Sequence, residues 1–309
     1  MNLKQLEAFV RIAELKSFSK AAKYLYLTQP TVSAHIASLE KELGEALFIR
    51  DTKGVELSEA GRELYAYAEQ MLVIEKKIQE HFEYRKRGKS VLHIAASTIP
   101  SQYLLPEIMA RFRERWPEEQ LKVTETDSAG VVDELLSRRA DIGFTGTVLD
   151  DHRCIYIPFY EDELVVITPG TEPFLSLQGS DPEKWIRKEP VILREEGSGT
   201  RREAGRLLAE AGVALEDLNI VASIQNQETI KRSVGNGMGI SILSALAAEE
   251  EIRSGRLLAF PLRREGGKRN INLVFEKEFP LMPAAGRFID VMENMYPGIR
   301  ACCRKDSFV

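Results

Sequence analysis

Three short segments near the ends of expected strands combine hydroxyl side chains with exposed backbone N–H donors. Residues 97–102 read Ser-Thr-Ile-Pro-Ser-Gln, Thr145 is followed by Gly-Thr, and residues 197–202 read Gly-Ser-Gly-Thr-Arg-Arg. Free backbone N–H groups and the positive end of a helix dipole favour anions at such points. We therefore predict a site that binds a small anionic molecule. The predicted site residues are Ser97, Thr98, Ile99, Ser101, Gln102, Thr145, Ser198, Gly199, Thr200, Arg201 and Gln227.

Some of these residues have a simpler interpretation. Thr200 and Glu203 are spaced as a capping box, so the third segment fits ordinary helix capping as well as ligand binding. Arg201 would supply the single formal positive charge of the site, with a solvent-facing position as the alternative. The Gly-rich run at 235–239 follows a helix and lacks the spacing of a nucleotide-binding loop, so we expect a turn there.

Few residues of the chain are suited to catalysis or metal binding. Its four histidines show no nucleophile, acid–base or metal-ligand spacing, and no serine stands in a Gly-x-Ser-x-Gly elbow. Cys154, Cys302 and Cys303 form neither a disulfide framework nor a metal-ligand pattern. We expect no catalytic residue, no metal and no cofactor. Unpaired thiols in a reducing compartment explain the cysteines, with a redox role for Cys302 and Cys303 as the alternative.

Alternating strands and helices are expected to position these segments within residues 90–309. Such alternation predicts an α/β domain with a mostly parallel sheet and helices on both of its faces. The run at 160–164 would carry the chain from a first lobe (90–162 and 267–309) into a second lobe (163–266). Strands are predicted at 91–96, 121–126, 141–145, 163–168, 191–193, 220–223, 239–243 and 271–275.

Two short helices joined by a tight turn are predicted over residues 18–40, after a first helix at 2–15. Thr28 can cap the second helix of the pair, and Pro30 lies in its first turn. Apolar residues recur at helical spacing on one face of each helix. The buried faces are predicted to hold Phe18, Ala21, Ala22 and Leu25 in the first helix and Val32, Ile36, Leu39 and Leu43 in the second.

The opposite face of the second helix carries small or polar side chains, which would enter a DNA major groove without steric conflict. Two short strands around a Gly turn at 47–57 add a wing. An ordinary helical hairpin with a solvated polar face is the alternative. The predicted DNA-contacting residues are Ser19, Gln29, Pro30, Thr31, Ser33, Ala34, His35, Ser38, Arg50 and Lys53.

These elements resemble the LysR family of bacterial transcriptional regulators. The resemblance implies a winged helix-turn-helix that binds double-stranded promoter DNA and an effector domain built like type 2 periplasmic solute-binding proteins. It also implies a homodimer or a homotetramer made of two dimers, with RNA polymerase as a further partner. Family members often carry Arg where this chain has Ala34 and Ser38, which shifts recognition toward backbone contacts and DNA shape. The matching segments are 6–9, 17–22, 28–33, 39–44, 47–50 and 57–61.

Residues 97–106 resemble the first cleft loop of a LysR branch associated with sulfur or selenium metabolism. This resemblance implies that the effector is a small oxyanion or a sulfur- or selenium-related anion, with a small carboxylate or amino-acid derivative as the alternative. An enzyme or a stand-alone solute-binding protein of the same architecture is the rival class, and the DNA-reading head argues against both.

Residues 59–89 predict one long helix with a heptad seam of apolar residues. About thirty residues at ~1.5 Å each give a rod of ~45 Å, too long to pack only on its own head. We expect the seam to pair two subunits, with an amphipathic helix lying on its own effector domain as the alternative. The seam residues are Ala60, Leu64, Tyr67, Met71, Ile74, Ile78 and His81.

Length and charge are consistent with a two-part soluble protein. The 309 residues exceed one typical domain, and the predicted parts are 1–58, 59–89 and 90–309. Residues 1–88 hold 14 Lys and Arg against 13 Asp and Glu, or +1, which leaves −6 for the rest of a chain of net charge −5. So small a basic excess favours two or more heads acting together on DNA. With no bilayer-spanning apolar run and no signal peptide, we expect a cytoplasmic protein without a membrane partner.

Overall fold

The computed structural model describes residues 1–51, 54–86, 90–262 and 267–297. The chain divides into two compact units, one formed by residues 1–88 with 137–139 and the other by residues 89–136 with 140–309. Each unit is considered by itself. Within the described ranges, no helix is both long enough and apolar enough to cross a membrane.

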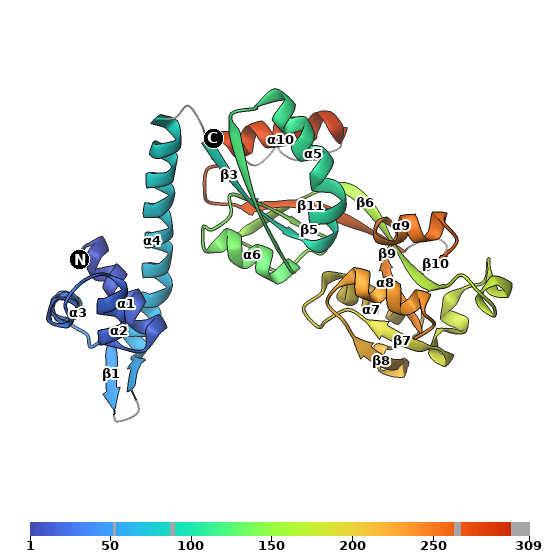
Figure 1. Ribbon diagram of the computed structural model, residues 1–309, viewed down its shortest axis with the longest axis horizontal. Coiled ribbons are helices and arrows are strands. Elements are labelled where there is room, and N and C mark those ends of the chain that lie inside the picture. The colour runs from blue at the N-terminus through green and yellow to red at the C-terminus, as the bar shows by residue number, and fades with distance from the viewer. Residues whose placement is uncertain (52–53, 87–89, 263–266, 298–309) are drawn as a thin grey trace. The chain divides into compact units, whose positions relative to one another are not determined.

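The first unit is a helix-turn-helix head followed by a wing and a long helix (Figure 1). Thr28 caps α3 by accepting a hydrogen bond from the backbone N–H of Thr31, as predicted. Phe9 and Phe18 pack against Phe48 of the wing, with ring centroids 5.3 and 5.6 Å apart. The elements are α1 (Leu3–Leu15), α2 (Phe18–Tyr24), α3 (Gln29–Leu43), β1 (Phe48–Asp51), β2 (Gly54–Leu57) and α4 (Glu59–Lys86).

The predicted inward faces of α2 and α3 are confirmed except at the helix ends. Leu25 is half-buried, and the prediction for Leu43 is wrong because its side chain is 42% exposed. Leu43 is the last residue of α3, and the chain turns away at Gly44, whose φ of 76° ends the helix. The buried residues are Phe18, Ala21, Ala22, Val32, Ile36 and Leu39.

The second unit is built on a mixed sheet that two lobes share (Figure 1). Among the described residues the strand order is β4-β3-β5-β11-β6-β9-β7-β8, and β10 also pairs with β6. The strands are β3 (Ser90–Ser97), β4 (Glu119–Thr126), β5 (Ile142–Thr145), β6 (Cys154–Pro169), β7 (Pro190–Leu193), β8 (Asn219–Ser223), β9 (Ile240–Ser244), β10 (Leu257–Pro261) and β11 (Lys268–Glu276). The main helices are α5 (Leu105–Arg115), α6 (Ser128–Leu136), α7 (Gly199–Glu210), α8 (Gln227–Gly235), α9 (Ala245–Arg253) and α10 (Pro283–Met295), with a short π-helical turn, η1 (Pro100–Leu104), before α5.

Each lobe has its own hydrophobic core. Phe112, Phe144 and Phe288 are fully buried in lobe I, between its strands and the helices α5 and α10. Leu207 and Phe260 lie in the separate core of lobe II. The two cores share no residue, and a smaller cluster in which Ala247 of α9 packs with Ile99 and Leu104 joins the lobes.

The prediction of a mostly parallel sheet is wrong in the middle of the unit. β3 pairs in parallel with β4 and β5, and β7 pairs in parallel with β8 and β9. In contrast, β6 and β11 are antiparallel to each other and to β5, β9 and β10. The predicted strand at 163–168 is only the second half of β6, which crosses from one lobe to the other. A register shift between Ile271 and Asn272 leaves Phe159 as an extra residue in β6. This bulge interrupts the two-residue alternation of side chains, so the full length of the strand could not be predicted from that alternation.

Candidate functional site

A small cavity of about 20 Å³ lies between the lobes of the second unit, where strand ends face helix starts. Lobe I contributes the loop after β3, the start of α6 and the loop after β5. Lobe II contributes the loop from β7 into α7. The lining residues are Ser97, Thr98, Ile99, Asp127, Ser128, Gly146, Arg194, Glu195, Ser198, Gly199, Thr200 and Arg269. Six of them belong to the predicted site, and they come from segments about 100 residues apart.

Arg269 is a buried arginine that connects both lobes through the cavity. Its Nε donates to Oδ2 of buried Asp162 at 2.8 Å, and Nη1 donates to Oγ1 of Thr200 at 3.2 Å. Asp162 also accepts a hydrogen bond from Ser244 at 2.6 Å. A Cβ added to Gly146 would lie 3.3 Å from the guanidinium, so lobe I also touches this side chain. The sequence analysis assigned residues 267–309 to the first lobe and did not predict Arg269 as a site residue.

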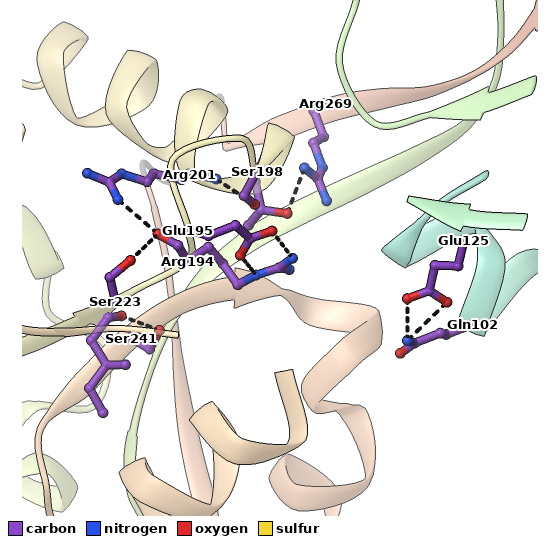
Figure 2. Close-up of polar contacts among 11 residues, drawn as sticks. Gln102, Glu125, Arg194, Glu195, Ser198, Arg201, Ser223, Ser241 and Arg269 are labelled. Atoms are coloured by element: carbon purple, nitrogen blue, oxygen red, sulfur yellow. Dashed lines mark hydrogen bonds and ion pairs between the residues drawn. The ribbon is translucent and has the colours of Figure 1, made fainter. Parts of the chain in front are cut away.

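Arg194 is the second guanidinium of the cavity, and it too was missed. Its side chain forms a two-point ion pair with Glu195, in which Nε donates to Oε2 at 2.8 Å and Nη2 to Oε1 at 2.9 Å (Figure 2). The Arg194 carbonyl accepts hydrogen bonds from Nη1 of Arg201 at 3.1 Å and from Oγ of Ser223 at 3.4 Å. Arg201 therefore braces the loop from behind instead of lining the cavity.

A larger cavity of about 430 Å³ adjoins the first one. The two share Thr98, Asp127, Arg194 and Glu195 as lining residues. Gln227 lines the larger cavity, and both polar atoms of its buried carboxamide have no hydrogen-bond partner among the described residues. A buried polar group without a partner costs about 1–3 kcal/mol. The orphaned carboxamide therefore marks a place where a bound molecule would regain that free energy.

Three helices begin beside these cavities, and a side chain accepts a hydrogen bond from the backbone at the start of each one. Asp127 accepts from the backbone N–H of Gly130 at the start of α6, at 2.7 Å. Asn226 caps α8. α7 is capped by Ser198, two residues before the predicted capping box, so that prediction is wrong. Thr200 lies inside the first turn instead, which frees its hydroxyl to accept from Arg269.

The lobes touch where two glycines of lobe II face polar side chains of lobe I. A Cβ added to Gly199 would lie 2.5 Å from Oγ1 of Thr147 and 2.8 Å from Oγ of Ser128. One added to Gly197 would lie 2.4 Å from Oδ2 of Asp127. The backbone of the β7–α7 loop approaches lobe I this closely only because glycine has no side chain.

On the helix-turn-helix head, the exposed face of α3 includes several predicted DNA-contacting residues. Gln29, Pro30, Ala34 and Ser38 are exposed, whereas Thr31, Ser33 and His35 are half-buried at the edges of that face. Ser19 on α2 is exposed and donates to Oε1 of Gln29 at 3.5 Å. Ser38 accepts a hydrogen bond from Gln5 at 3.0 Å, which ties α3 to α1. The side chain of Arg50, and Lys53 as a whole, lie outside the described residues.

The predicted seam of α4 changes character along the helix. Ala60 and Leu64 pack on the core of the head. Tyr67, Met71 and Ile78 are exposed on the single chain. The His81 side chain lies outside the described residues. An exposed apolar row on an isolated helix is unfavourable in water, and a partner helix is one way to cover it.

Two family models match the chain. One, described as a bacterial regulatory helix-turn-helix protein of the lysR family, matches residues 3–62, and the other, described as the LysR substrate binding domain, matches residues 85–296. The chain belongs to the LysR family. It is a DNA-binding transcriptional regulator with an effector-binding domain, and this family consists of regulators and not of enzymes.

Relatives of this LysR-family chain are similar over nearly the whole length. The uncharacterized HTH-type transcriptional regulator YeiE of Escherichia coli strain K12 is 33% identical over 292 residues, which cover 94% of this chain and 96% of YeiE. The HTH-type transcriptional regulator CysL of Bacillus subtilis is 30% identical over 300 residues, covering 94% and 96%. Full-length CbnR, solved in complex with its target DNA, has a TM-score of 0.73 at 21% identity, covering 95% of this chain and 99% of CbnR, and shares the fold.

The predicted effector residues of this LysR-family regulator fall into three groups. Ser97, Thr98, Ile99, Ser198, Gly199 and Thr200 line the small cavity, and Gln102 and Gln227 line the larger one with Thr98. Thr145 is buried at the end of β5, and its Oγ1 has no hydrogen-bond partner in the part of the chain that the structure describes. Ser101, Thr145 and Arg201 line neither cavity.

Over the ranges that the structure describes, no three His, Cys, Asp or Glu side chains are grouped as they would be in a metal site. Burial raises the pKa of Cys154 to about 11, so its thiol stays protonated and unreactive at neutral pH. Cys302 and Cys303 lie outside the described residues.

Proposed function

We propose that this LysR-family regulator is controlled by a small anion, an oxyanion or a sulfur- or selenium-related anion, that binds in the cleft between its lobes. The observation that carries the proposal is the pair of buried guanidinium groups, Arg194 and Arg269, beside Ser and Thr hydroxyls in one cavity. A guanidinium matches an oxyanion with two parallel hydrogen bonds. Donors left unpaired by a wrong ligand add selectivity.

The size of the cavity couples binding to a change in the cleft. About 20 Å³ is the room of roughly one water molecule, less than a tetrahedral oxyanion needs. An effector that enters this small cavity from the larger one must therefore part the lobes or displace a side chain, and either change gives two states with different affinities. A ligand shifts such an equilibrium by its differential affinity, which is the property a regulator requires.

An amino-acid derivative is a second candidate, because Asp127 and Glu195 line the same cavity as the arginines. In that case the carboxylate of the ligand would face a guanidinium, and its ammonium group would face Asp127 or Glu195.

We also propose that two copies pair through α4, as a homodimer or as a homotetramer made of two dimers, and act in the cytoplasm on promoter DNA with RNA polymerase as a further partner. The exposed row of Tyr67, Met71 and Ile78 supports the pairing. A nearly neutral head gains affinity when two heads bind one site together.

Titration calorimetry of the full-length protein tests the effector class. Sulfate, selenate, selenite and a panel of neutral amino acids serve as ligands at constant ionic strength. We expect Ser97→Ala and Thr98→Val to weaken oxyanion binding at least about fivefold, since each loses one donor at the cavity. Ser101→Ala is the matched control, because Ser101 lies in the next turn of the chain but lines neither cavity. Tight binding of a purely apolar ligand, unaffected by the first two changes, would overturn the proposal.

A further inference from the structure

We propose that Glu195 is an internal stand-in for the effector: its carboxylate occupies Arg194 in the empty cleft, and an anionic effector must displace it. This inference rests on the proposed anion site and names the residue that would determine its selectivity. The two-point ion pair between Arg194 and Glu195 has the geometry with which a guanidinium holds a bound oxyanion. Because the partners are neighbours in sequence, the carboxylate is always within reach of the guanidinium.

The charges around the cavity call for such a displacement. The lining residues supply two guanidinium groups, Arg194 and Arg269, and two carboxylates, Asp127 and Glu195. A third carboxylate, Asp162, holds Arg269 from behind. The positive charges are therefore already balanced, and an added anion would meet carboxylates at close range unless one of them leaves.

Among these three carboxylates, Glu195 can move into water at the lowest cost in free energy. Asp162 is buried and bound by both Ser244 and Arg269. Asp127 accepts from the backbone of α6. The side chain of Glu195 is 27% exposed and borders the larger cavity, whereas that of Arg194 is 4% exposed. Rotation of Glu195 places its charge in water, and the incoming anion takes its place on buried Arg194, so neither charge is left buried without a partner.

The backbone beneath the pair is held in place, which makes the exchange local. The Arg194 carbonyl accepts from both Arg201 and Ser223, and this fixes the loop while the Glu195 side chain rotates (Figure 2). Arg194 can therefore pass from Glu195 to an anion without refolding the loop. A ligand that binds only the guanidinium gains little over Glu195. Selectivity goes to anions that also use the Ser and Thr donors.

Sulfate titration of full-length wild type, Glu195→Gln and Glu196→Gln at constant ionic strength tests the inference. Glu196 is exposed, and it does not line either cavity, so its change removes the same charge from the same loop. We expect Glu195→Gln to bind sulfate about tenfold more tightly than wild type, or about 1.4 kcal/mol, and Glu196→Gln to stay within about twofold of wild type. Adding Arg194→Met to Glu195→Gln should abolish the gain, which separates release of Arg194 from a general change of charge.

Each other outcome has a distinct meaning. If Glu195→Gln binds sulfate no more tightly than wild type while Ser97→Ala still weakens it, the displacement is refuted and the anion site stands. If Glu195→Gln instead weakens the binding of a neutral amino acid, Glu195 is a ligand for an ammonium group and the inference is wrong. If neither wild type nor Glu195→Gln binds any oxyanion tested, both the inference and the proposed effector class fall. Glu195→Ala repeats the test if the glutamine variant unfolds at a lower temperature than wild type.

Discussion

At the scale of single residues, a buried charge in the effector unit is tolerated because several parts of the fold satisfy it together. Arg269 is held by Asp162 and Thr200, and Asp162 in turn by Ser244. These residues come from β11, β6, α7 and the end of β9. The network therefore joins the strand that crosses between the lobes to the helix that faces the cavity.

Removing the positive member of this network should destabilise the effector unit strongly. Arg269→Met leaves Asp162 buried without its counter-ion, and a buried pair broken in this way costs about 3–5 kcal/mol. Lys268→Met is the control, because Lys268 is exposed beside Glu161 and its loss should leave the free energy of unfolding nearly unchanged. Urea unfolding followed by circular dichroism measures both values. Equal losses in the free energy of unfolding for the two variants would contradict the role of Arg269 as the counter-ion of buried Asp162.

On the DNA-binding head, residues of two kinds should respond differently. Thr31→Ala, Ser33→Ala and His35→Ala should each weaken operator binding by about 1–3 kcal/mol where a base contact is lost. Arg50→Ala and Lys53→Ala should weaken binding to all DNA alike and reduce its dependence on salt concentration. Fluorescence anisotropy with operator and scrambled DNA at several salt concentrations separates the two effects. Unchanged operator affinity in all five variants would mean that DNA binds elsewhere.

At the scale of elements, the two strands β6 and β11 connect the lobes, a role that their local sequence does not indicate. β6 and β11 hold both lobes in one sheet, and the extra residue Phe159 lies where their register shifts. Phe159 contacts the rings of Phe144 and Tyr296 in lobe I. The bulge therefore bends the long strand at the boundary of a packed lobe, a suitable place for a hinge.

The helix α4 should pair two subunits through its exposed apolar row. Replacing Met71 and Ile74 together with Glu places like charges across a paired helix, so the assembly should dissociate and lose cooperative binding to a paired site. Ala66 and Gln79, both exposed on the same helix, carry the same two charges outside the seam when replaced with Glu and serve as the control. Analytical ultracentrifugation gives the mass of each variant. A Met71 and Ile74 variant with the parent mass would place the interface elsewhere.

At the scale of the whole effector unit, the lobes can approach closely because lobe II has glycines, Gly197 and Gly199, where it meets lobe I. Gly199→Val would force a clash with Thr147 and Ser128 and hold the cleft open. If the effector displaces the Glu195 side chain while the lobes stay in contact, we expect about tenfold weaker binding, because the competent state becomes rare. An effector that parts the lobes would instead bind Gly199→Val at least as tightly as wild type. Gly286→Val is the control, since no atom lies within 4 Å of a Cβ added there. Calorimetry with the best oxyanion of the panel measures both, and equal affinities would show that binding does not require this contact.

The sequence by itself determined the elements whose signals are local. Caps such as Thr28, the helical spacing of Val32, Ile36 and Leu39, and the donor-rich segments near Ser97 and Ser198 all depend on neighbours within one or two turns. Such short-range patterns can be recognised from the sequence alone, because helix geometry places residues three or four apart on the same face. The family could be recognised for the same reason, since its head is a chain of such local motifs.

Only the tertiary structure decided which charges face the cleft. Arg194 and Arg269 are far apart in sequence, and each looks like a surface residue beside other charged positions. Their burial follows from where β7 ends and where β11 crosses between the lobes. Both positions depend on long-range strand pairing, parallel for β7 and antiparallel for β11, that no local period encodes. Arg201 looked equally suitable in the sequence, yet the fold turns it to the Arg194 carbonyl. The partner of a charged side chain is determined by which residues the fold brings close to it, and not by its neighbours in sequence. The chemistry of this cleft is therefore a property of the folded molecule.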